Sequence, residues 1–149
     1  MPILPLEQRT PAIIHRLTDI WQATVLKTHT FLSEADIALL QPEVQIGLAK
    51  IESLYAYYDD QGIIQGFIGI DLPKIEMLFV AVNSRGQGIG KQLLNFAVTN
   101  LGARWVDVNE QNELGVVFYY HLGFRMISRS AWDSQGRPFP ILHLKLDRA

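Results

Sequence analysis

The sequence predicts a mixed α/β fold in one domain, with the element order β-α-α-β-β-β-α-β-α-β-β. Its length of 149 residues suits one domain that buries its own core. A hydrophobic content of 48% with 19% charged residues indicates a folded chain rather than a disordered one. Segments with helical spacing alternate with runs of β-forming residues, and no linker, repeat or low-complexity stretch divides them. We therefore expect a single domain over residues 1–149.

The first third of the chain predicts a short strand followed by two helices. Residues 3–7 favour the strand. Thr10 is a suitable N-cap and Pro11 suits a first helical turn, so a helix is expected to begin there. Residues 27–32 have no clear period and are interpreted as a link between helices. Ser33, with Asp36 three positions later, predicts the start of a second helix that runs to about residue 50.

The middle of the chain changes to a β pattern. Residues 54–58 and 63–70 flank the turn signature of residues 59–62, Asp-Asp-Gln-Gly, and predict a hairpin. Residues 75–82 predict another strand. A glycine-rich stretch over residues 85–90 then leads into a helix whose apolar stripe is Ile89, Leu93, Leu94 and Ala97.

The last third predicts a strand, a helix and a closing hairpin. Residues 105–108 favour a strand. Residues 112–122 favour a helix that ends at Gly123, a residue type typical of the position after a helix. Residues 124–132 and 141–146 predict the last two strands, joined by a turn at Asp-Ser-Gln-Gly.

The composition excludes several chemistries. The chain has no cysteine, so it cannot use a thiol nucleophile, a disulfide framework or a cysteine-ligated metal. A net charge of −2 argues against a general nucleic-acid or anionic-membrane binder. The four histidines lack metal-ligand spacing, so no metal is expected. Without a signal-peptide core or a membrane span in the sequence, a cytoplasmic protein is expected.

The glycine-rich stretch predicts a binding site for phosphate. Residues 78–90 run from strand through loop to helix, and glycine lets successive backbone amides converge on an anion. The positive end of the following helix favours phosphate as well. A P-loop is excluded because Arg85 stands where its first glycine belongs. A dinucleotide fingerprint is excluded because Lys91 stands at its last glycine.

Two spaced motifs resemble those of the GNAT N-acetyltransferases. Arg85, Gly88 and Gly90 fill the Q/R-x-x-G-x-G/A pattern, and residues 112–119 resemble N-x-x-A-x-x-F-Y, with Gly115 in place of the commoner alanine. The element order is similar over essentially the whole chain. The resemblance implies a mixed central sheet of about six to seven strands with four helices, its fourth and fifth strands splayed. Within the family the chain resembles the small bacterial YjaB-like subgroup of lysine acetyltransferases, notably in residues 108–113.

The resemblance implies acetyl-CoA as co-substrate, and the cofactor would supply the sulfur that the chain lacks. Backbone groups of Leu78, Phe79 and Val80 would hold the pantetheine arm. The amides expected to hold the pyrophosphate belong to Arg85, Gly86, Gln87, Gly88, Ile89 and Gly90. Asn112 would bind the arm near the last helix, although a plain N-cap is its simpler role. Tyr119 would contact the thioester and protonate the departing thiolate as a general acid.

A second set of expected residues concerns the amine acceptor and the removal of its proton. By resemblance to the histone acetyltransferase branch, Glu76 would be the base, its pKa raised by apolar walls. An ion pair with Lys74 is the alternative, with water as the route for the proton. In the family the acceptor is lined by the loop between the first two helices and by the final hairpin. That nominates as substrate residues His29, Phe31, Leu32, Trp132 and Phe139.

The expected function is direct transfer of an acetyl group to a primary amine, on a protein lysine or a small molecule, in a ternary complex. The alternative from another class is a module that senses acyl-CoA without turnover. Ser130, Asp133 and His143 supply the residue types of a hydrolase triad, but no G-x-S-x-G elbow accompanies them. The amine-bearing acceptor is the only partner expected besides the cofactor, and the protein is expected to be a monomer or homodimer.

Overall fold

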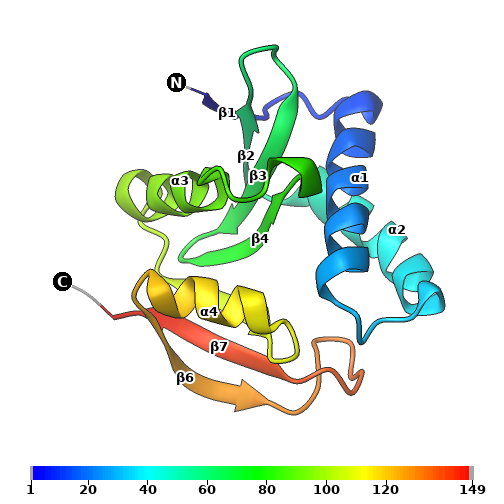
Figure 1. The fold of residues 1–149 in the computed structure, drawn as a ribbon, viewed down its shortest axis with the longest axis vertical. Coiled ribbons are helices and arrows are strands. Elements are labelled where there is room, and N and C mark those ends of the chain that lie inside the picture. Colours follow the sequence, from blue (N-terminus) through cyan, green and yellow to red (C-terminus); the bar gives the residue numbers. More distant parts are fainter. Residues whose placement is uncertain (1, 148–149) are drawn as a thin grey trace. The chain divides into compact units, whose positions relative to one another are not determined.

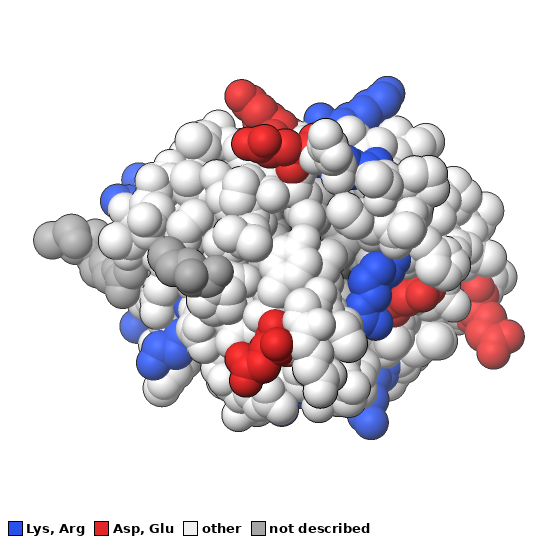
Figure 2. Space-filling view, turned by 90° about the horizontal axis from the view of Figure 1, so that it is seen from above, with Lys and Arg blue, Asp and Glu red and all other residues white. Residues whose placement is uncertain are grey.

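The computed structural model describes residues 2–147 (Figure 1). The chain divides into two compact units, with the boundary between residues 103 and 104. These described residues form four α-helices and seven strands in the predicted order. None of their helices combines the length and the apolar character needed to cross a membrane. On the face shown in Figure 2, Lys and Arg are scattered among Asp and Glu instead of forming one basic patch.

The sheet of the first unit is antiparallel throughout. Its order is β1-β2-β3-β4. The strands are β1 (Ile3–Pro5), β2 (Ser53–Tyr58), β3 (Ile64–Asp71) and β4 (Lys74–Val80). The predicted hairpin is present because Asp59 Oδ1 accepts hydrogen bonds from the amides of Gln61 and Ile63, at 2.8 and 2.9 Å. Gly62 takes the positive φ of 77° that the turn requires.

The first unit has three helices, and local side-chain capping fixes the first two. The helices are α1 (Pro11–Thr28), α2 (Glu34–Lys50) and α3 (Ile89–Phe96), with a 3-10 turn η1 (Val82–Ser84) and a π turn η2 (Ala97–Leu101). The Thr10 side chain caps α1, and Ser33 and Asp36 form a capping box on α2. Helix α1 extends into the predicted link because the His29 amide donates to the Val25 carbonyl at 2.8 Å.

Helices cover both faces of the first unit's sheet (Figure 1). Phe67 of β3 is fully buried in a cluster with residues of α1 and α2, including Leu17 and Ile37. The neighbouring Gly66 faces α3, where a Cβ atom would lie 3.0 Å from Ile89 Cγ2. This alternation along β3 is what a strand buried on both faces requires. Strand β3 therefore has a fixed position between helices on both faces, and it pairs with β4, the strand that precedes the glycine loop.

The second unit is a three-stranded antiparallel sheet with one helix. Its elements are β5 (Trp105–Asn109), α4 (Glu113–His121), β6 (Phe124–Ser130) and β7 (Ile141–Leu146), with the strand order β5-β7-β6. Alternate residues such as Val108 and Leu144 are buried, and α4 packs on that face. Asp107 and His143 occupy the opposite face. β6 ends at Ser130, before the predicted end of that strand.

Candidate active site

The loop between η1 and α3 has a backbone that glycine alone adopts readily. Gly86 and Gly88 have φ values of 81° and 77°. A Cβ atom added at either position would meet nothing within 4 Å. The backbone conformation, and not crowding by the protein, is therefore what favours glycine here. The open space beside both residues leaves room for a ligand to approach the main chain.

The N-terminus of α3 has no side-chain cap. Gly88 is its N-cap residue, and the first intrahelical bond runs from the Gln92 amide to the Gly88 carbonyl at 3.0 Å. Helix geometry then leaves the amides of residues 89–91 without an intrahelical partner. Unpartnered amides at the positive end of a helix are a suitable site for phosphate. Of the residues predicted to bind phosphate, Ile89 and Gly90 have amides in this position, whereas the Arg85 amide donates to the Val82 carbonyl at 3.4 Å.

Strand β4 carries the next group of predicted residues. Leu78, Phe79 and Val80 are half-buried on it. The Val80 carbonyl accepts a hydrogen bond from Thr24 Oγ1 of α1 at 3.0 Å, a contact between residues 56 positions apart that no local pattern predicts. A carbonyl oxygen has two lone pairs, so one remains available. Phe79 packs 5.7 Å from Phe67, between ring centroids, and anchors the strand in the core.

The Glu76 side chain, also on β4, is 38% exposed. Its Oε1 lies 3.8 Å from Lys74 Nζ. The contact is the ion pair that the sequence left open as the alternative to a base with apolar walls. An exposed carboxylate of this kind has direct access to water, through which it can take up a proton.

His29 lies at the end of α1 with one ring nitrogen already bonded. Thr28 Oγ1 lies 2.7 Å from His29 Nδ1 and donates its proton to the Thr24 carbonyl at 2.8 Å. Because the hydroxyl has one hydrogen, it must accept from Nδ1–H, so Nε2 carries the lone pair. Burial lowers the pKa of the imidazole below its ordinary value of 6.5, which favours the neutral ring.

The other two substrate residues predicted in the first unit surround His29. The Phe31 ring lies 5.3 Å from the imidazole, between centroids. The Leu32 amide donates to the His29 carbonyl at 2.9 Å, and its side chain packs against the α1–α2 core. The structure therefore brings His29, Phe31 and Leu32 together in one turn. Thr28, which fixes the imidazole, was missed, although its spacing of four from Thr24 is a helix-back-bonding signal.

Asn112 caps α4 with its own side chain. Its Oδ1 accepts a hydrogen bond from the Gly115 amide at 3.2 Å. A Cβ atom on Gly115 would lie 2.9 Å from Asn112 Cγ and closer still to its amide nitrogen. The glycine that departs from the family pattern is therefore the residue that lets the Asn112 amide fold over the first turn. Its N-cap role is present in the structure.

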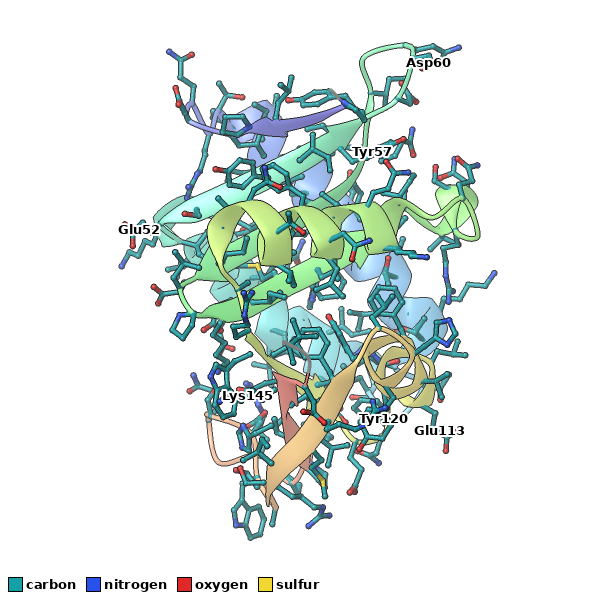
Figure 3. All side chains as sticks on the ribbon, turned by 90° about the vertical axis from the view of Figure 1, so that its left-hand side faces the viewer. Glu52, Tyr57, Asp60, Glu113, Tyr120 and Lys145 are labelled. Carbon is teal, nitrogen blue, oxygen red and sulfur yellow. The ribbon has the colours of Figure 1, made fainter. Side chains whose placement is uncertain are left out.

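Tyr119 lies near the other end of α4 and is 8% exposed. Its ring packs edge-on against Phe118 and Phe124, at centroid distances of 5.1 and 5.6 Å. Burial raises the pKa of the phenol well above its usual value. The hydroxyl therefore keeps its proton at neutral pH. By contrast Tyr120, labelled in Figure 3, is 37% exposed and lies beside Arg125.

Trp132 and Phe139 lie in the connection between β6 and β7. Trp132 is exposed and Phe139 is half-buried. Asp133 organises the turn between them by accepting hydrogen bonds from the Gln135 and Arg137 amides, at 2.9 and 2.8 Å, and from Arg137 Nε at 2.7 Å. These contacts leave Asp133 as a turn residue. Over the part of the chain that the structure describes, no group of His, Asp and Glu is suited to a metal ion.

Comparison with known proteins identifies the family. The model of the acetyltransferase (GNAT) domain matches residues 50–126. The chain is 38% identical over 129 residues to the peptidyl-lysine N-acetyltransferase YjaB of Salmonella typhimurium, covering 87% of this chain and 88% of that protein. The solution structure of apo YjaB from Escherichia coli superposes with a TM-score of 0.87 at 31% identity, over all of both chains.

A more distant structure shares the fold. The PaiA N-acetyltransferase of Thermoplasma acidophilum, in complex with coenzyme A, has a TM-score of 0.67 at 20% identity over 97% of this chain and 99% of that one. Both the predicted fold class and the predicted YjaB-like resemblance are confirmed. The chain belongs to the GNAT family of acetyltransferases and is an enzyme of that family.

Proposed function

We propose that this acetyltransferase transfers the acetyl group of acetyl-CoA directly to a primary amine in a ternary complex, with a protein lysine as the leading acceptor. The observation that carries the proposal is the uncapped N-terminus of α3, which follows glycines in left-handed conformation. The Salmonella relative is named as a peptidyl-lysine enzyme, and the Thermoplasma protein was solved with coenzyme A. Small-molecule amines are the second acceptor class.

The residues that would hold acetyl-CoA fit its chemistry. The loop from Arg85 through Gly90 suits a pyrophosphate, because its glycines leave the backbone open and the amides of Ile89 and Gly90 lie uncapped at the positive end of α3. The Arg85 amide itself donates to the Val82 carbonyl at 3.4 Å. Backbone groups of Leu78, Phe79 and Val80 suit the amide groups of a pantetheine arm. When bound, acetyl-CoA supplies the activated acetyl group and the sulfur. Asn112 would add a side-chain amide to the same ligand while its Oδ1 caps α4.

Tyr119 would act as the proton donor to the leaving sulfur. Burial keeps its Oη protonated, so the residue is in the correct state to donate at neutral pH. The same burial makes full ionisation of the phenol costly. Tyr119 would therefore give up its proton only when negative charge develops on the sulfur beside it. Proton donation would then coincide with the departure of the thiolate.

Two residues are proposed for the uptake of the amine's proton. Glu76, beside Lys74, would act through water. His29 is the second candidate because Thr28 leaves its Nε2 as a proton acceptor and burial keeps the ring neutral. If His29 is the base, kcat/KM falls on acidification only as the pH passes through a pKa below 6.5. The His29→Gln variant should lose that limb, whereas Glu76→Gln should keep it.

The function is tested by following thiol release from acetyl-CoA with a panel of acceptors. A lysine-containing peptide, spermidine and an aminoglycoside cover the protein, polyamine and drug-like amines. Release that depends on the peptide, with the acetyl group located on lysine by mass spectrometry, supports the proposal. Tight binding of coenzyme A in a calorimeter with no acceptor-dependent release would instead establish the acyl-CoA sensor.

We also propose that both units act as a single GNAT domain. The matched residues 50–126 extend across the boundary at residue 103, and the residues proposed for the ligand come from both sides of it. A cytoplasmic location and a monomeric or homodimeric state complete the proposal. Its only partner besides acetyl-CoA is the amine-bearing acceptor, with no role for nucleic acid or membrane.

A further inference from the structure

Three polar side chains form a row across the sheet of the second unit. Asp107 of β5 is the register partner of His143 of β7, and Ser130 lies at the end of β6, on the other side of β7. The distance from Asp107 Oδ1 to His143 Nδ1 is 2.7 Å. The distance from His143 Nε2 to Ser130 Oγ is also 2.7 Å. Both ring nitrogens of His143 are therefore engaged, each by a different strand.

The chemistry of the outer groups fixes where the protons lie. A carboxylate accepts hydrogen bonds only, so His143 Nδ1 must carry the proton that bonds to Asp107. In the neutral ring Nε2 then has the lone pair and accepts from the Ser130 hydroxyl. The serine proton thus points at an imidazole nitrogen whose opposite side is held by a carboxylate. This is the arrangement that activates a serine nucleophile.

The strand register selects a different acid from the one that the sequence suggested. Asp133 was the acid considered beside Ser130 and His143, but it is bonded to Arg137 in the turn. Asp107 replaces it, from 36 positions before His143. The missing G-x-S-x-G elbow does not bear on this row, because Ser130 lies on a strand and not on a strand-to-helix turn.

The row is accessible to water and to small molecules. The His143 and Asp107 side chains are each 29% exposed, and Ser130 is half-buried. Helix α4 covers the opposite face of this sheet. The neighbouring charges have their own partners: Arg129 is paired with Glu110 at 2.7 Å, and Lys145, labelled in Figure 3, has its Nζ 5.3 Å from the centroid of the Trp105 ring. In these contacts neither Arg129 nor Lys145 is directed at Ser130.

We propose that Ser130 is a nucleophile toward activated acyl esters, with His143 as its base and Asp107 holding the imidazole. The Ser130 O–H bond breaks, its proton moves to His143 Nε2, and a bond forms between Oγ and the acyl carbon. The bond from that carbon to the leaving oxygen breaks, and the leaving group departs as an alkoxide or phenolate. Water then attacks the acyl-serine and the bond from the acyl carbon to Oγ breaks. Both protons of the water pass to the solution, so the acid leaves as a carboxylate, and the imidazolium returns its proton to Oγ.

The inference is independent of the proposed amine acetylation, and its test uses the full chain. The protein is incubated with p-nitrophenyl acetate, whose phenolate leaves without protonation, and separately with a fluorophosphonate probe. Nitrophenolate release is followed by absorbance, and peptide mass spectrometry locates the modification. We expect release above the rate without protein, and one acetyl or phosphonyl group on Ser130.

Variants assign the parts of the row. Ser130→Ala and His143→Gln should abolish labelling, and Asp107→Asn should slow it by about 100-fold or more, since the wrong tautomer is then favoured. The matched control is Ser128→Ala, because Ser128 is the register partner of His143 yet has no hydrogen bond to its ring. It should label at the wild-type rate.

Two results would overturn the inference. One is a wild-type protein that stays unlabelled at Ser130 with both reagents. The other is equal labelling of the wild type and the His143→Gln variant, with circular dichroism and the melting temperature showing that both are folded. Loss of labelling in Ser130→Ala with unchanged acetyl-CoA-dependent amine transfer would show that two separate chemistries are present.

Discussion

The N-termini of α3 and α4 solve the same physical problem in opposite ways. Each helix begins with amides that have no intrahelical acceptor. Helix α4 satisfies part of this need internally, through the Asn112 side chain. Helix α3 has a glycine at its N-cap position and no side-chain cap among the residues described. One helix start is capped within the protein, and we propose that an anion completes the other.

The two helix starts also use glycine for different reasons. Gly88 is required by its backbone, at φ 77° with open space beside it. Gly115 has an ordinary helical backbone but a crowded neighbour in Asn112. A side chain at the first position would alter the loop and fill the space proposed for the ligand. A side chain at the second would displace a cap. The proposed roles differ accordingly: the first helix start would bind the ligand, the second stabilises α4, and Tyr119 further along α4 would take part in turnover.

The substitution with the largest expected effect disrupts the proposed anion site at the N-terminus of α3. Gly88→Glu places a carboxylate beside the uncapped amides and a side chain at a left-handed backbone position. We expect coenzyme A to bind about 100-fold more weakly or worse, because like charges at an interface cost several kcal/mol. Isothermal titration calorimetry measures the dissociation constant.

A matched control variant separates the loss of the anion site from the effect of backbone strain. Gly62, in the β2–β3 turn next to Asp60 of Figure 3, has the same φ of 77° and the same open space. Gly62→Glu therefore introduces the same backbone strain and the same charge away from the loop. It should bind coenzyme A like the wild type. Wild-type binding by Gly88→Glu would show that the α3 N-terminus is not the phosphate site.

The next effect concerns turnover and leaves binding intact. Tyr119→Phe removes one hydroxyl from a buried ring and keeps its packing against Phe124. We expect kcat to fall by about 100-fold, the lower end of the range for a general acid, with little change in affinity for coenzyme A. Tyr120→Phe, at the exposed neighbouring position, should leave both quantities unchanged. Equal turnover in the two variants would remove Tyr119 from the acid role.

Much of the fold was predictable because its signals are local. Thr10, Ser33 and the turn at residues 59–62 each act through hydrogen bonds within a few positions of themselves. The end of α1 was misplaced because Thr28 bonds back to the Thr24 carbonyl and extends a helix that has no apolar period there. The π turn η2 was not predicted either, since its residues continue a helical pattern without a break.

Candidate site residues could be nominated from the sequence where a motif is contiguous, but not where strand register decides which side chains meet. The glycine loop and Asn112 could be nominated because each motif is one continuous short stretch of chain, residues 85–90 and residues 112–119. Asp107, as the acid beside His143, could not, because that contact depends on which residues β5 and β7 place opposite one another. A single sequence contained both Asp107 and Asp133 without indicating which carboxylate reaches the imidazole.

A smaller effect sharpens the role of Asn112. Asn112→Ala removes the cap and should lower the free energy of unfolding by about 1 kcal/mol. Asn112→Asp keeps an acceptor at the N-cap and should leave stability unchanged, while it loses an amide donor and adds negative charge. We expect that variant to bind coenzyme A about tenfold more weakly, as one lost hydrogen bond implies. Urea denaturation and calorimetry measure the two effects, and unchanged binding would leave Asn112 as a cap alone.

The smallest effect tests whether Gly115 exists for the sake of Asn112. In the wild type, Gly115→Ala gains helix propensity worth about 1 kcal/mol and loses a cap of similar size, so stability should change by less than about 0.5 kcal/mol. On the Asn112→Ala background the crowding side chain is gone, and the same substitution should stabilise the protein. A Cβ atom at position 115 would lie 3.2 Å from Val108 Cγ2 on both backgrounds, so this contact cancels in the double-mutant cycle. Equal effects of Gly115→Ala on both backgrounds would show that the glycine has no connection with the cap, and that the two helix starts differ only in their N-cap residue.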